Sequence, residues 1–164
     1  MHILLATDAD WIVDEVIAAL GDDDVHFTVC REGRAVAAEV KQQVPDLAIL
    51  DLQIGSMGAM AVTMALRLDE SAGAVDHVKV LILLDRAADI HLARRSGAEG
   101  WLIKPLDALR LRRAADALAA GGRYDEGLPP DATAVEPMVP LADADDAEIE
   151  DQVESTEEEP ATAG

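Results

Sequence analysis

The sequence predicts an α/β fold in which five parallel strands form a doubly wound sheet with helices on both faces. Two observations indicate this fold. Short apolar runs alternate five times with stretches of helical periodicity, and the connections between them are short. Strict alternation of this kind favours a parallel sheet built from right-handed crossovers. The third and fourth apolar runs are hydrophobic nearly throughout, as is typical of central strands that are covered on both faces.

Five segments have the length and apolar character of strands. They cover residues 3–6, 25–30, 47–51, 78–84 and 101–103. A turn or a stretch of polar residues separates each segment from the helical pattern that follows. The order along the chain is therefore five successive β/α units.

A segment of helical periodicity follows each strand. After the first strand, Ile12, Val16 and Leu20 recur every four residues, which places them on one helix face. The other helices are predicted over residues 35–40, 57–68, 86–96 and 107–118. Gly97 is suited to end the fourth helix, and Asp107 is suited to cap the N-terminus of the fifth.

The distribution of charge divides the chain into two regions. The formal net charge is −20, and residues 125–164 hold 14 Asp and Glu but no Lys or Arg. Five of the seven prolines also lie in that stretch. So polar a segment cannot bury enough apolar surface to offset an ordering entropy of about 1–2 kcal/mol per residue. We predict one domain over residues 1–122 and a disordered acidic tail over residues 123–164.

The composition argues against several classes of function. A strongly acidic chain lacks the basic surface that nucleic acids and anionic membranes require. The sequence has no apolar run of 18 residues, and the first strand begins too early for a signal peptide to precede it. We therefore expect a cytoplasmic protein. Cys30 is the single cysteine, which excludes an internal disulfide and a Cys-based zinc site, and we expect its thiol to be buried.

Charged and polar side chains stand where the predicted strands end. They are Thr7 and Asp8 after the first strand, Asp51 on the third, Asp85 after the fourth and Lys104 after the fifth. The carboxyl ends of parallel strands meet at one edge of the sheet, where open α/β sheets bind ligands. Asp8 and Asp51 together would suit Mg²⁺, which prefers oxygen ligands. With Lys104 as a nearby cation, the set suits transfer of a phosphoryl group to Asp51.

The segments ILLATDAD, LAILDLQIG, VLILLD and GAEGWLIKP stand in the order and spacing of a bacterial response-regulator receiver domain. The chain resembles that family over residues 1 to about 120, which implies a flavodoxin-like fold and a role in two-component phosphorelay signalling. The resemblance implies that a histidine kinase or phosphotransfer protein phosphorylates Asp51. It implies Mg²⁺ held by Asp8, Asp51 and the main-chain carbonyl of Gln53, and a phosphoryl contact from Lys104. Trp101 lies where such domains carry an aromatic switch residue.

Three positions depart from the family pattern. Receivers carry two adjacent acids after the first strand, but Thr7 stands at the first of these positions, so metal binding should weaken. A hydroxyl residue is expected after the fourth strand, but Asp85 stands there, and its carboxylate would repel a phosphoryl group. The Met-Pro pair after the phosphorylated strand is replaced by Ile54 and Gly55.

These departures leave a second reading of the chain open, as a phosphorylation-independent pseudo-receiver that binds proteins. A third reading is a phosphatase of the haloacid-dehalogenase type, because Asp8 and Asp10 form a DxD pair, although the sequence continues Trp11-Ile12 instead of Gly-Thr. A dinucleotide site is disfavoured, because no glycine follows the first strand before Asp10. On the leading reading the chain is no enzyme, apart from self-catalysed phosphoryl transfer to Asp51 and hydrolysis from it.

The predicted fourth and fifth helices carry a group of basic residues. They are Arg94, Arg95, Arg110, Arg112 and Arg113. The resemblance implies that the fourth helix, fifth strand and fifth helix form a surface for effectors or for a homodimer. Because the acidic tail starts next to this surface, we hypothesise that the tail folds back over the arginines and competes with partners.

Overall fold

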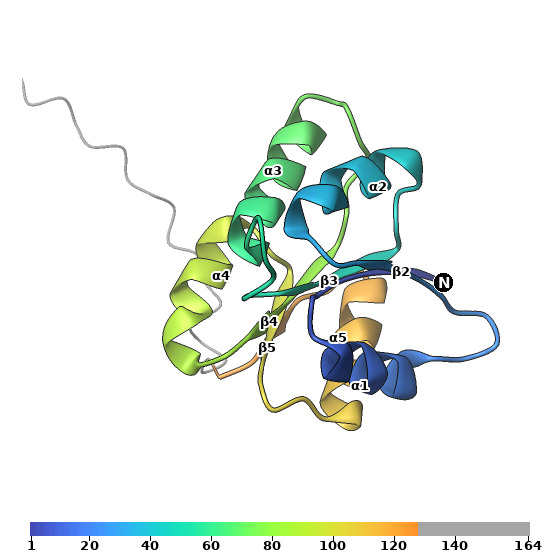
Figure 1. The fold of residues 1–164 in the computed structure, drawn as a ribbon. Coiled ribbons are helices and arrows are strands. Elements are labelled where there is room, and N and C mark those ends of the chain that lie inside the picture. The colour runs from blue at the N-terminus through green and yellow to red at the C-terminus, as the bar shows by residue number, and fades with distance from the viewer. Residues whose placement is uncertain (128–164) are drawn as a thin grey trace, which may run out of the picture. The chain divides into compact units, whose positions relative to one another are not determined.

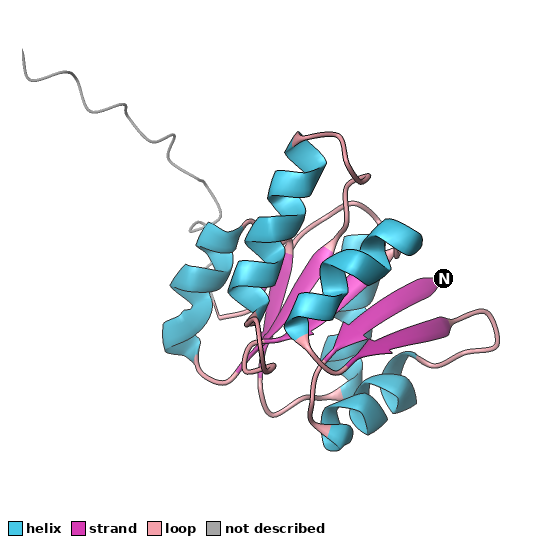
Figure 2. Cartoon of the chain, turned by 45° about the horizontal axis from the view of Figure 1, so that its top comes forward, coloured by secondary structure: helices cyan, strands magenta, loops and turns pink. Residues whose placement is uncertain are grey.

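The computed structural model describes residues 1–127, in which a parallel sheet lies between two layers of helices (Figure 1, Figure 2). The strands are β1 (His2–Ala6), β2 (His26–Cys30), β3 (Leu47–Asp51), β4 (Val80–Leu84), β5 (Gly100–Ile103) and β6 (Tyr124–Asp125). The helices are α1 (Asp10–Leu20), α2 (Val36–Gln42), α3 (Ala59–Ser71), α4 (Ile90–Ser96) and α5 (Ala108–Ala119). The predicted alternation of five strands and five helices is confirmed.

The strands follow the order β2-β1-β3-β4-β5-β6, and every neighbouring pair is parallel. The chain moves to one side from β1 to β2 and then crosses to the other side at β3. Such a reversal leaves a crevice beyond the carboxyl ends of the two strands that flank it, here β1 and β3. The fold therefore directs the loops after Ala6 and Asp51 to one place.

Alternate side chains of the strands contribute to two separate hydrophobic cores, one on each face of the sheet. Leu4, Leu50 and Ile82 face the layer of α2, α3 and α4, where Val62 and Leu66 of α3 pack. Ile3, Leu5, Ile49 and Leu81 face the opposite layer with α1 and α5, and Figure 1 shows these two helices together on that side. Because both faces are covered, β3 and β4 are buried along their whole length. This explains their nearly continuous apolar sequence.

The sheet has one more strand than the sequence predicts. Tyr124 and Asp125 pair in parallel with Gly100 and Trp101 and extend the sheet beyond β5. The sequence predicts these residues as part of the tail, because Gly121 and Gly122 follow the last helix and residues from Asp125 onward include no Lys or Arg. Residues 123–127 therefore lie on the domain, and the remainder of the predicted tail, residues 128–164, lies outside the described residues.

The helix ends follow the predicted local signals. The Asp107 carboxylate accepts hydrogen bonds from the backbone N–H groups of Leu109 and Arg110, both at 3.0 Å, so it caps α5. Gly97 adopts a left-handed conformation with φ of 85° directly after α4, a conformation that glycine adopts without steric cost. The predicted fourth helix starts with a 3₁₀ turn at Ala87–Asp89 before α4 proper. Within residues 1–127, no helix has the length and apolarity needed to cross a membrane.

Cys30 ends β2 as a free, buried thiol, as the sequence predicts. Burial raises the pKa of this thiol to about 11. Because alkylating reagents attack the thiolate, we expect alkylation of the native protein at neutral pH to be about 100-fold slower than alkylation of the unfolded chain. Intact mass spectrometry over time, with and without denaturant, measures the ratio. Equal rates would show that the end of β2 opens readily.

Candidate functional site

Asp51 is the centre of a polar site at the carboxyl edge of the sheet. It ends β3 and is only 2% exposed. Its Oδ1 atom lies 2.6 Å from the Lys104 ammonium and accepts a weaker hydrogen bond from the Gln53 backbone N–H at 3.3 Å. Its Oδ2 atom accepts a hydrogen bond from the Thr7 hydroxyl at 2.9 Å. Both oxygens of a nearly buried carboxylate are therefore bound, which holds it in one orientation.

Lys104 carries the positive charge of the site. It follows β5, where its backbone N–H donates to the Leu84 carbonyl at 2.8 Å. The ammonium group is shared, because it lies 3.1 Å from Asp85 Oδ1 as well as 2.6 Å from Asp51. The Trp11 ring lies 5.9 Å from the same nitrogen, at the outer limit of a cation–π contact. One cation thus serves two carboxylates and faces an aromatic ring.

Asp85 points into the site, although its carboxylate would repel a phosphoryl group. Its side chain is 37% exposed, whereas that of Asp51 is 3% exposed. Asp85 therefore lies at the rim, and Asp51 lies inside. The two acids meet through Lys104, whose charge offsets part of their mutual repulsion.

Asp8 and Asp10 follow β1 but have different surroundings. Asp8 Oδ2 accepts a long hydrogen bond from the Gly55 backbone N–H at 3.3 Å, which ties the loop after β1 to the loop after β3. Asp10 forms an ion pair with Arg31 at 2.6 Å, and its side chain is 86% exposed. Asp8 therefore belongs to the candidate site, whereas Asp10 faces solvent with a partner of its own.

The oxygen atoms around Asp51 form a sparse set for a divalent cation. Among residues 1–127, no group of three or more His, Cys, Asp or Glu side chains is arranged to hold a metal ion. Mg²⁺, however, keeps several water ligands and needs only one or two carboxylates in such a site. Asp8 and Asp51 supply two carboxylates at the ends of β1 and β3, and the loop after Asp51 supplies the Gln53 main-chain carbonyl. Thr7 supplies a hydroxyl in place of a further carboxylate, which lowers the negative charge available to the ion.

Trp101 lies in the core, away from the residues that surround Asp51. It is completely buried, pairs with Ile82 of β4 in the sheet and belongs to the core that faces α2, α3 and α4. Its indole N–H donates to the Glu126 carbonyl at 2.8 Å. The sequence placed Trp101 on β5 correctly. The sequence did not indicate the contact of Trp101 with Glu126, because Glu126 lies beyond the predicted domain boundary at residue 122.

Two residues of the site were missed or misjudged in the sequence. Trp11 was noted only as a departure from a phosphatase motif, but its ring lies beside Lys104. Thr7 was read as the loss of a metal ligand, but its hydroxyl also donates directly to Asp51. The position of Thr7 at the end of the first strand correctly groups it with Asp51, because β1 and β3 are neighbours in the sheet.

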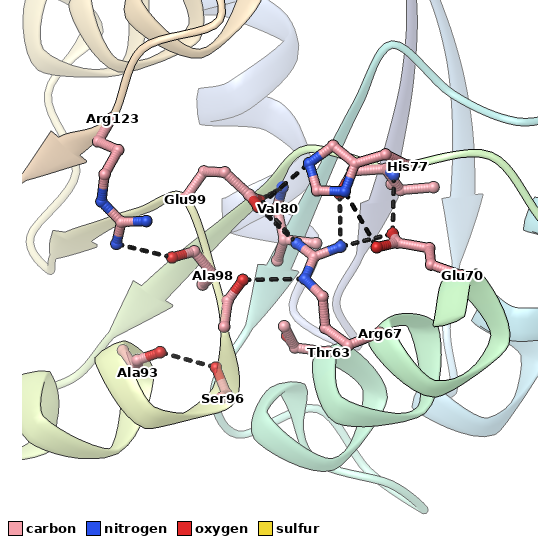
Figure 3. Close-up of polar contacts among 12 residues, drawn as sticks. Thr63, Arg67, Glu70, His77, Val80, Ala93, Ser96, Ala98, Glu99 and Arg123 are labelled. Carbon is pink, nitrogen blue, oxygen red and sulfur yellow. Dashed lines mark hydrogen bonds and ion pairs between the residues drawn. The ribbon is translucent and has the colours of Figure 1, made fainter. Parts of the chain in front are cut away.

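A second polar cluster lies at the opposite edge of the sheet (Figure 3). Arg67 of α3 forms ion pairs with Glu70 and Glu99, and His77 lies 3.0 Å from Glu70 and 3.3 Å from Glu99. The two carboxylates also accept the backbone N–H groups of Val78 and Val80. Because the Arg67 guanidinium binds both acids, this cluster joins α3 to the starts of β4 and β5.

Comparison with known proteins agrees with the fold. The family model described as "Response regulator receiver domain" matches residues 3–116. No curated protein sequence matches the chain.

Three solved structures illustrate the structural similarity. The receiver domain of NtrX from Brucella abortus has a TM-score of 0.62 at 21% identity, covering 72% of this chain and 98% of that one. CheY4 of Vibrio cholerae has a TM-score of 0.62 at 21% identity, with coverage of 70% and 95%. The signal receiver domain of NarL from Mycobacterium tuberculosis has a TM-score of 0.62 at 24% identity, with coverage of 73% and 96%. Sequence identities below 25% support a shared fold but not a shared partner or activity.

Proposed function

Because the chain belongs to the family of response regulator receiver domains, we propose that Asp51 accepts a phosphoryl group from a histidine kinase or phosphotransfer protein. The modified domain then signals through contact with another protein. One observation carries the proposal: a nearly buried carboxylate lies 2.6 Å from a lysine ammonium at the carboxyl edge of a parallel sheet. This pair combines a nucleophile with a cation that can stabilise a phosphorylated product.

The transfer requires little of the protein beyond positioning and charge. An oxygen of Asp51 forms a bond to phosphorus while the bond from phosphorus to the donor breaks, and the donor leaves with that electron pair. The product is a mixed anhydride on Asp51. Lys104 already lies beside Asp51 and would contact the added phosphoryl oxygens. Mg²⁺ held by Asp8, Asp51 and the Gln53 carbonyl would neutralise charge on the transferred group.

A second function has support from the same site. Lys104 is divided between Asp51 and Asp85, and the Thr7 hydroxyl already satisfies the second oxygen of Asp51. A closed network of this kind is complete without a phosphoryl group. It favours a pseudo-receiver that binds partners through its unmodified surface.

Incubation of the full chain with a small phosphodonor and Mg²⁺ separates the two functions. Phosphorylation predicts an adduct of one phosphoryl group by intact mass spectrometry, which Asp51→Asn abolishes. Asp116→Asn removes an exposed carboxylate on α5 and should leave the adduct intact. Absence of the adduct in the wild-type chain over a broad pH range would overturn the proposal and favour the pseudo-receiver.

The phosphatase reading receives no support from the geometry. The second acid of the DxD pair would have to act as a general acid. Asp10 instead is exposed and forms an ion pair with Arg31 at 2.6 Å. Receiver domains are in general not enzymes in the usual sense, and a release of phosphate from simple phosphate esters by the wild-type chain would contradict this assignment.

A further inference from the structure

The segment Tyr124–Gly127, named the latch below, covers the outer edge of β5. Tyr124 pairs with Gly100, and Asp125 pairs with Trp101. The Tyr124 backbone N–H donates to the Glu99 carbonyl at 3.1 Å. A strand at this position satisfies backbone groups that would otherwise form the open edge of the sheet.

Glu126 makes the most extensive contacts of the latch. Its main-chain carbonyl accepts the Trp101 indole N–H at 2.8 Å, and its carboxylate accepts the Ile103 backbone N–H at 2.6 Å. The same carboxylate binds Arg110 through two nitrogens, Nε at 2.6 Å and Nη2. Arg110 also donates to the carbonyls of Ile103 and Pro105. One residue thus joins β5 to α5.

The surface beneath the latch consists mainly of hydrogen-bond donors. The indole N–H of Trp101, the backbone N–H of Ile103 and the guanidinium of Arg110 all point at Glu126. Beside them the surface is apolar, because Gly127 lies close to the Ile90 side chain. A Cβ atom added to Gly127 would lie only 3.2 Å from that side chain. An extended segment that carries a carboxylate complements such a surface. The latch itself is a segment of this kind.

The closed latch contains features that favour its release. The pairing covers only two residues, and Gly121, with φ of 84°, precedes it after α5. Within residues 1–127, the buried Asp125 Oδ1 atom has no hydrogen-bond partner and only a long ion pair with Arg123 at 3.7 Å. A buried acceptor without a hydrogen bond is only partly compensated by so long an ion pair, which weakens the conformation that buries it.

We propose that the latch opens, and that the surface beneath it binds an extended acidic segment of a partner protein, which takes the place of Glu126. When the latch is closed, Glu126 accepts the Trp101 indole N–H, and the latch occupies the edge of β5 that the partner would bind. When the latch is open, the Trp101 indole N–H and the Ile103 backbone N–H lose their acceptors, and Arg110 loses its carboxylate partner. The latch is tethered, so its local concentration is high and a partner must bind tightly to displace it.

Hydrogen exchange of the Trp101 indole N–H in the full chain tests whether Glu126 holds the latch closed. The Glu126→Gln variant keeps the shape of the side chain but loses the charge-assisted bonds, and exchange should accelerate on the order of tenfold. Glu15→Gln, an exposed change on α1, is the matched control. The Trp11→Phe variant assigns the two indole signals in NMR spectra. Equal exchange in Glu126→Gln and Glu15→Gln would overturn the proposal.

Binding of a peptide tests the surface itself. A synthetic peptide with the sequence of residues 121–127 should shift the Trp101 indole signal of the Glu126→Gln chain. On the wild-type chain it should bind on the order of tenfold more weakly, because the intact latch competes. Arg110→Lys, added to Glu126→Gln, should weaken the peptide further, since lysine loses the two-nitrogen contact. Equal affinity for the Glu126→Gln and wild-type chains would overturn the proposal, as would binding that Arg110→Lys leaves unchanged.

Discussion

Replacement of Asp85 with threonine is expected to raise the rate of Asp51 phosphorylation by at least about tenfold. In the wild-type chain, the Asp85 carboxylate lies 3.1 Å from the Lys104 ammonium, which also binds Asp51. A phosphoryl group on Asp51 would bring further negative charge to the same cation. Two unit charges 4 Å apart interact by about 4 kcal/mol at an effective dielectric constant of 20, so relief of a third of that repulsion accounts for a factor of ten.

The rate is measured as the growth of the phosphoryl adduct by intact mass spectrometry, with a small phosphodonor and Mg²⁺. Asp116→Asn changes the net charge by the same amount, but at an exposed position on α5, and should leave the rate unchanged. Asp51→Asn in the Asp85→Thr background should abolish the adduct. An unchanged or slower rate in Asp85→Thr would show that Asp85 does not oppose the phosphoryl group.

The fold was predictable because its main determinants are local in the sequence. Apolar runs such as Leu47–Asp51, together with stop signals such as Gly97 and the cap at Asp107, define each element. Strict alternation then leaves few topologies for the chain. The strand at Tyr124–Asp125 was missed because two residues are too few to show the alternation that identifies a strand. Its position depends on Glu126, whose partners Trp101 and Arg110 lie far away in sequence.

The candidate site was predictable in its membership but not in its contacts. Each strand end contributes a polar residue, and the parallel sheet brings these ends together, so Asp51, Asp85 and Lys104 were expected to meet. The sequence could not show which carboxylate forms the ion pair with Lys104, because that depends on differences of a few ångströms in side-chain position. The structure shows that the lysine is shared. Thr7 likewise appeared as an absent acid, whereas it is a hydrogen-bond donor to Asp51.

Replacement of Arg67 with methionine is expected to destabilise the domain by about 3 kcal/mol and to lower its melting temperature by about 10 °C. The guanidinium binds Glu70 and both oxygens of Glu99, and it donates to the carbonyls of Val78 and Gly97. The side chains of Arg67, Glu70 and Glu99 are only 21%, 12% and 15% exposed. Without Arg67, two poorly solvated carboxylates would face each other without a fixed cation, and such charges are costly.

Thermal unfolding of the full chain measures the loss, and Arg113→Met, an exposed arginine on α5, is the matched control.

A second readout follows from Glu70. Burial alone would raise its pKa, but bonds from Val78 and His77 and the charge of Arg67 lower it below the ordinary value of 4.5. A group with a lowered pKa in the folded state stabilises the fold above its unfolded pKa, and this stabilisation is lost as pH falls through the folded value. The wild-type chain should therefore lose stability as pH falls below about 4.5, and Arg67→Met should lose less over the same range. Equal acid sensitivity in the two chains would show that Arg67 does not hold the Glu70 carboxylate in its charged form.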